Sequence, residues 1–170
     1  MPPFRRREVL LTGLALAAAV PRAAQALEPP AGEVLLTVRG RLRRPNLPQH
    51  AGFDMAMLRG LPQTDIVTKT PWYSTVRRFT GPLVRDVLGA AGARGEKVVA
   101  VALNDYRVEI PFDDLLRHDV VLAVLMDGKP MPVRDKGPLF IMYPFDRQPE
   151  LRTAVYFSRC AWQLVSLEVR

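Results

Sequence analysis

Four loop segments of the sequence combine aromatic, amide and charged residues with prolines. They are residues 68–73 (TKTPWY), 102–106 (ALNDY), 127–138 (DGKPMPVRDKGP) and 143–146 (YPFD). Prolines restrict the backbone, an aromatic ring can stack on a flat ligand, and carboxylates or amides can bind the edge of that ligand. This combination predicts a preformed pocket for a flat, polar heterocycle.

Each segment also has a purely structural explanation. Trp72 can be a core residue, Asn104 and Asp105 can form an ordinary hairpin turn, and residues 134–137 can form a solvated turn. Cys160 is expected to be a small, buried apolar residue. Because the chain has one cysteine and two histidines, and no nucleophile lies at a recognisable spacing from a base, the sequence favours neither covalent catalysis nor a Cys/His metal centre.

The pattern of apolar residues predicts a single α+β domain, rich in strands and with a few short helices. One helix is expected over residues 53–58 with Asp54 as its N-cap, a second from Pro82 to residue 88, and a helical turn over 111–116. No glycine-rich phosphate loop follows a strand, which excludes Rossmann and P-loop folds. The expected strands are residues 33–38, 65–70, 97–103, 106–110, 119–126, 139–143 and 161–169.

The first 26 residues have the pattern of a secretory signal peptide. Three arginines at 5–7 precede an uncharged apolar run over residues 9–20, and the small residues Ala24 and Ala26 follow. We therefore expect this segment to be removed and residues 27–170 to form a periplasmic domain. A retained membrane anchor is the alternative, and the export route, Sec or twin-arginine, stays open.

The charge balance is less basic than it first looks. The chain has 24 Lys and Arg against 17 Asp and Glu, a net charge of +7. Removal of the first 26 residues takes away four arginines and one glutamate, which leaves +4. This modest charge does not favour a nucleic-acid partner.

The loops and the segments between them form an ordered set of motifs: TKTPW at 68–72, RFxGPLxxDVL at 78–88, ALNDY at 102–106, RDKGPL at 134–139 and WQL at 162–164. Together they resemble the oxidoreductase molybdopterin-binding domain, the sulfite-oxidase fold, in its small exported single-domain form. The resemblance covers about residues 33–170. It implies a mixed α+β domain that holds a pterin among its loops.

The resemblance also implies how a pterin would be bound. Trp72 and Tyr106 would lie near the ring, and Asn104 would donate to the ring carbonyl. A pterin presents an exocyclic amine beside a ring N–H, and these two donors match the two oxygens of one carboxylate. That carboxylate is either Asp105 or Asp135.

Catalytic members of the family bind molybdenum through a cysteine just before the tryptophan of the first motif. This chain has Thr68 and Thr70 there, and a hydroxyl is a poor replacement for a soft thiolate. The two hydroxyls would occupy the place of the thiolate. Arg134 or Lys136 would neutralise a phosphate or an enolate-like oxygen of the ligand.

Two functions follow as expectations. The first is a periplasmic pterin-binding protein that acts without catalysis on a membrane-bound signalling protein, such as a cyclic-di-GMP enzyme or a kinase. The second is a molybdenum-cofactor-dependent oxidoreductase that holds its cofactor without a cysteine ligand. Neither involves nucleic acid.

Overall fold

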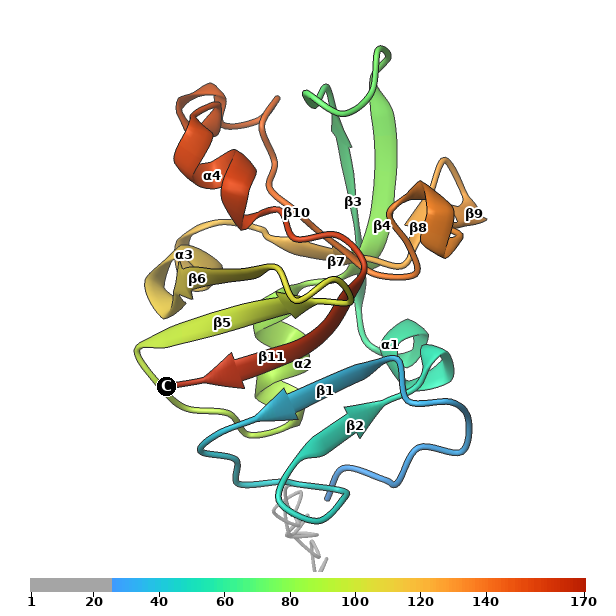
Figure 1. Ribbon diagram of the computed structural model, residues 1–170, viewed down its shortest axis with the longest axis vertical. Helices are drawn as coiled ribbons and strands as arrows, with labels where there is room; N and C mark the ends of the chain where they lie inside the picture. Colours follow the sequence, from blue (N-terminus) through green and yellow to red (C-terminus); the bar gives the residue numbers. More distant parts are fainter. Residues whose placement is uncertain (1–25) are drawn as a thin grey trace, which may run out of the picture.

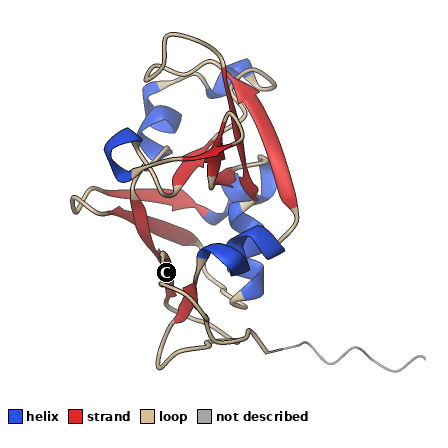
Figure 2. Ribbon diagram, turned by 90° about the vertical axis from the view of Figure 1, so that its right-hand side faces the viewer, coloured by secondary structure: helices blue, strands red, loops and turns tan. Residues whose placement is uncertain are grey.

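The computed structural model describes residues 26–170, so the predicted signal peptide lies outside the described residues except for Ala26. Strands predominate, and the helices are short (Figures 1 and 2). The elements are β1 (Leu36–Arg39), β2 (Ala51–Phe53), α1 (Met55–Gly60), β3 (Gln63–Thr68), β4 (Arg77–Pro82), α2 (Val84–Ala90), β5 (Lys97–Ala102), β6 (Arg107–Pro111), α3 (Phe112–Arg117), β7 (Val121–Ala123), β8 (Leu125–Met126), β9 (Lys129–Pro130), η1 (Val133–Asp135), β10 (Phe140–Met142), η2 (Pro149–Leu151), α4 (Ala154–Arg159) and β11 (Leu164–Val169).

A five-stranded sheet with the order β2-β1-β11-β5-β6 forms the lower half of the molecule in Figure 1. Only β1 and β11 pair in parallel, and the other neighbours in this sheet are antiparallel. The alternating residues Leu36 and Val38 are fully buried, because successive side chains of a strand point to opposite faces. The β5–β6 hairpin belongs to this sheet, and its pairing with β11 positions the turn between β5 and β6.

A four-stranded sheet, β3-β4-β8-β9, and the two-stranded pair β10-β7 complete the core. The strand β4 crosses closely over β7, and this approach requires a glycine at position 81. A Cβ on Gly81 would overlap the carbonyl oxygen of Leu122. The close crossing brings Phe79 and Phe140 into an edge-to-face contact, with their ring centroids 5.8 Å apart.

The helices cover the sheets and close their ends. The helix α2 buries Val84, Val87 and Leu88, and it lies behind β5 and β11 in Figure 1. The helix α1 begins as predicted, because the carboxylate of Asp54 accepts a 2.8 Å hydrogen bond from the backbone N–H of Met57. No helix of residues 26–170 is long and apolar enough to cross a membrane.

The α+β class is confirmed, but several expected elements are wrong in detail. Pro82 is the last residue of β4, not the first residue of a helix, and α2 begins at Val84. The apolar run 119–126 does not form one strand, because Val124 separates β7 from β8 and the two strands belong to different sheets. The pattern of apolar residues also gave no sign of β2, β4, β9 or α4.

Candidate functional site

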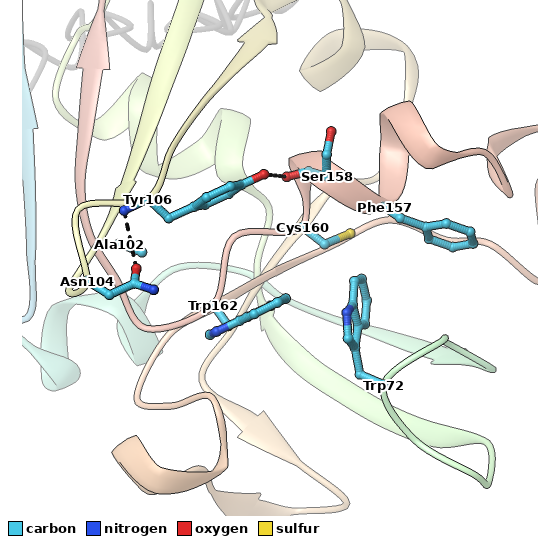
Figure 3. Close-up of a pocket in the computed structure, with 8 residues that line it drawn as sticks. All are labelled: Trp72, Ala102, Asn104, Tyr106, Phe157, Ser158, Cys160 and Trp162. Carbon is cyan, nitrogen blue, oxygen red and sulfur yellow. Dashed lines mark hydrogen bonds between the residues drawn. The ribbon is translucent and has the colours of Figure 1, made fainter.

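A cavity of about 310 Å³ lies between the β5–β6 turn and α4. Its size falls in the range of small-molecule sites, and its walls are mainly apolar and aromatic. Figure 3 shows Tyr106 and Trp162 on opposite sides of the cavity. The residues that line it are Trp72, Ala102, Asn104, Tyr106, Phe157, Ser158, Cys160 and Trp162.

Trp72 belongs both to the aromatic core and to the cavity wall. Its ring makes edge-to-face contacts with Phe140 at 5.5 Å, with Trp162 at 5.8 Å and with Phe157 at 6.1 Å between centroids. These contacts hold the two indole rings at an angle of 69° to each other. The loop after β3 and the segment before β11 therefore meet at the cavity through rigid rings, as a stacking surface requires.

The β5–β6 turn contributes the polar groups on the other side. The Oδ1 atom of Asn104 accepts a 3.2 Å hydrogen bond from the backbone N–H of Tyr106, which fixes the side chain. Asp105 lies at the tip of the turn with φ of 63°, a left-handed conformation that Asn and Asp tolerate. The Nδ2 group of Asn104 has no partner among the described residues, so it is available to a ligand in the cavity.

The helix α4 borders the cavity, and two polar side-chain contacts add to the packing of its aromatic residues. The Tyr106 hydroxyl donates a 2.8 Å hydrogen bond to the carbonyl oxygen of Ser158 (Figure 3). At the end of α4, Arg159 forms a largely buried ion pair with Asp114 of α3. Asp114 also accepts a 3.2 Å hydrogen bond from the hydroxyl of Tyr143, whose pKa is raised by burial.

Cys160 follows α4 and forms part of the cavity wall. It is 1% exposed, which confirms its predicted burial. Its thiol donates a 3.4 Å hydrogen bond to the carbonyl oxygen of Tyr156, and burial raises the pKa of the thiol to about 12. The side chain is therefore a neutral thiol at physiological pH, whereas a metal ligand must be the thiolate.

Thr68 and Thr70 do not line the cavity. Thr68 is fully buried at the end of β3, and its hydroxyl lies 3.4 Å from the carbonyl oxygen of Lys69. The Thr70 hydroxyl is buried and has no hydrogen-bond partner among residues 26–170. The described residues contain no group of three or more His, Cys, Asp or Glu side chains that could hold a metal ion. Two threonine hydroxyls are not a donor set suited to molybdenum, whereas aromatic cavity walls suit a pterin ring.

The loop of residues 134–136 lies beside the cavity rather than in it. The ammonium group of Lys136 is 5.9 Å from the centroid of the Trp162 ring and 5.1 Å from that of Tyr73. Asp135 lines a separate groove together with Arg77 and other residues. Arg134 is exposed and also lies outside the cavity. Of this loop, only Lys136 is placed next to a cavity wall.

Three of the nine candidate residues thus line the cavity: Trp72, Asn104 and Tyr106. The other wall was not predicted, and it consists of residues of α4 and of the segment before β11. Trp162 belongs to the WQL motif, so the sequence could have indicated it as a site residue. The sequence gives no such indication for Phe157 and Ser158, because α4 has no fully buried residue and therefore no clear apolar periodicity.

Comparison with known proteins agrees with this architecture. Residues 48–145 match the family model described as the oxidoreductase molybdopterin binding domain. Among solved structures, the crystal structure of the sulfane dehydrogenase SoxCD from Paracoccus pantotrophus matches with a TM-score of 0.57 and 15% sequence identity. That match covers 79% of this chain and 37% of the SoxCD chain. No curated protein matches the chain.

The architecture is therefore the α+β fold of the sulfite-oxidase type. Since the family model covers more than half of the sequence, the chain belongs to the oxidoreductase molybdopterin-binding domain family. The likeness to SoxCD, at 15% identity, concerns the fold alone, and this chain spans little more than a third of the SoxCD chain. At a coarse level the family supports a cofactor of the pterin type.

Proposed function

We propose that this protein binds a pterin in the cavity between the β5–β6 turn and α4, and that it acts as a ligand-responsive regulator rather than as a redox enzyme. The observation that carries the proposal is the composition of the cavity wall. Two indole rings and the Tyr106 ring border a space of about 310 Å³. A flat heterocycle gains most from such walls, because its faces contact aromatic rings over a large area.

The polar groups at the cavity suit the edge of a pterin. The Asn104 amide nitrogen faces the cavity, where it can donate to the ring carbonyl. Asp105 is the exposed neighbour of Asn104 in the same turn and does not itself line the cavity, whereas Asp135 lines a separate groove, so we assign the amine and ring N–H to Asp105. Lys136, beside Trp162, would stabilise negative charge on the ligand. A role of Arg134 or Asp135 in ligand binding has weaker support, because neither residue lines the cavity.

The regulatory role rests on what the site lacks as a metal centre. Thr68 and Thr70 stand where catalytic relatives would place a thiolate, and both are buried away from the cavity. A pterin bound without molybdenum has no metal to cycle between oxidation states, so binding itself becomes the signal. A membrane-bound signalling protein in the periplasm, such as a cyclic-di-GMP enzyme or a kinase, is the proposed receiver.

One feature favours the alternative of a molybdenum-cofactor oxidoreductase. The thiol of Cys160 is at the cavity wall, and it is the only thiol of the chain. Cys160 lies near the last strand, however, and not in the first motif, where catalytic relatives place their metal ligand. This mismatch in position makes the enzyme the second candidate.

Analysis of the purified protein, in the form that cells accumulate, separates the two candidates. Metal content and extracted pterin are measured on the same sample. The proposal predicts a fluorescent pterin after acid extraction and oxidation, with molybdenum far below one atom per chain. Stoichiometric molybdenum that disappears in Cys160→Ala would establish the enzyme instead.

A further inference from the structure

The segment that follows β1 and the segment between α2 and β5 run through the lower part of Figure 1, away from α4 at the top, and together with the end of β1 they carry five arginines. Arg39 ends β1, the next three follow in the loop after it, and the fifth lies between α2 and β5. We call this group the arginine patch, and it consists of Arg39, Arg41, Arg43, Arg44 and Arg94.

Backbone contacts hold the two loops of the patch side by side. The N–H of Arg43 donates to the carbonyl oxygen of Gly92, and the N–H of Arg94 donates to that of Arg41, both at 3.1 Å. Leu42 lies between Arg41 and Arg43 and packs against the core. Because side chains alternate along an extended segment, these two arginines point away from the core together.

The patch carries uncompensated charge. None of its five arginines forms an ion pair with a described residue, although ten ion pairs exist elsewhere in the described part of the chain. The neighbouring carboxylates of Glu28 and Glu96 are not paired with them either. Four of the five side chains are exposed, and Arg44 is half-buried. A concentrated positive surface of this kind attracts polyanions.

The start of the described chain adjoins the patch. Ala26 and Arg44 line the same groove. In the sequence, the apolar run of residues 9–20 comes shortly before Ala26. Contact of that run with a bilayer before processing therefore brings this end of the domain to the bilayer surface.

We propose that the arginine patch binds the phosphate headgroups of an anionic phospholipid bilayer. Guanidinium groups form paired hydrogen bonds with phosphate oxygens, and the binding free energies of several basic residues near an anionic surface add up. Bound in this way, the domain turns the side that carries α4 and the cavity away from the lipid. The proposal stands independently of the ligand in the cavity.

The test is sedimentation of the purified protein with vesicles of phosphatidylglycerol and phosphatidylcholine in equal parts. The patch variant carries Arg41→Gln, Arg43→Gln and Arg94→Gln. The matched control carries Arg78→Gln, Arg107→Gln and Arg117→Gln, which change the net charge equally outside the patch. Circular dichroism verifies that both fold. A retained apolar run would be common to all three proteins, so their differences report on the patch.

We expect the patch variant to partition about a hundredfold more weakly than the unmodified protein, since each arginine contributes roughly fivefold. The control should lose less than about fivefold, and raised salt should weaken the binding of both. Equal partitioning of the patch variant and the control would overturn the proposal. So would an absence of binding by the unmodified protein, or equal binding to vesicles of phosphatidylcholine alone.

Discussion

The Tyr106 hydroxyl and the Ser158 carbonyl oxygen, 52 positions apart in the chain, are joined by a 2.8 Å hydrogen bond. This bond ties the β5–β6 turn to α4, the two elements that border the cavity. The half-buried rings of Tyr156 and Phe157 also pack α4 against the core, and Arg159 pairs with Asp114. The hydrogen bond is therefore one of several contacts that hold α4 beside the cavity.

Tyr106→Phe removes the bond but keeps the ring. We expect the free energy of unfolding to fall by about 1 kcal/mol, the usual contribution of one hydrogen bond. Ligand affinity should change less than about threefold, because ring stacking persists, whereas Tyr106→Ala should weaken it at least about tenfold. Urea denaturation and ligand titration measure the two effects. Equal affinity loss in both variants would show that the hydroxyl, not the ring, matters.

Asp105 and Asp135 form a matched pair for the carboxylate that binds the ligand edge. Asparagine is used at both positions because Asp105 has a left-handed backbone, which alanine disfavours. We expect Asp105→Asn to weaken pterin binding about tenfold or more, the effect of one lost charge-assisted hydrogen bond. Asp135→Asn should have little effect, since Asp135 lines a different groove. If a titration instead showed the larger loss of pterin affinity in Asp135→Asn, the ligand-binding carboxylate would be that of Asp135.

Much of the fold was predictable from the sequence because its signals are local. The helix cap at Asp54 and the apolar strand β5 are each encoded by residues close together in the chain, and the structure contains both. The helix start predicted at Pro82 was wrong, because a proline is acceptable both at the start of a helix and at the end of a strand. Only the contact of Gly81 with β7, forty residues away in the chain, decides between them.

Part of the lining of the candidate cavity was predictable for the same reason. Trp72, Asn104 and Tyr106 stand in motifs with recognisable turn and aromatic chemistry, and they line the cavity. Cys160 and Ser158 reach it only because α4 folds back over the β5–β6 turn. No local pattern in the sequence encodes that long-range placement.

The Asp54 carboxylate should make stability depend on acid pH. Hydrogen bonds from the backbone N–H groups of Met57 and Gly32 hold the pKa of this carboxyl below its usual value. A pKa lowered by folding stabilises the protein above the unfolded-state pKa of about 4 and loses this effect as pH falls through the folded-state value. Asp54→Asn should therefore unfold at lower urea concentration at pH 7.

The difference should shrink as the pH is lowered, because asparagine caps a helix without a titrating charge. The urea midpoints of the two proteins should therefore move closer together as the pH falls below the unfolded-state pKa of about 4. A constant difference between pH 7 and acid would contradict the assigned role of the Asp54 charge.

Cys160→Ala should separate packing from ligation. We expect unchanged ligand content and a loss of about 1 kcal/mol in the free energy of unfolding, as for a small truncation in a core. The reason is that the Cys160 thiol is buried and neutral, with its pKa raised to about 12. Loss of bound pterin or metal from a folded variant would show that the sulfur holds the ligand.

The central claim, a pterin in this cavity, is tested most directly by tryptophan fluorescence. The chain has two tryptophans, and both line the cavity. Titration of the ligand-free protein with a tetrahydropterin should therefore quench the emission strongly and saturably, at one ligand per chain. In Asn104→Ala the same quench should require a higher ligand concentration. Emission that stays unchanged while equilibrium dialysis detects bound pterin would place the ligand elsewhere and contradict the account.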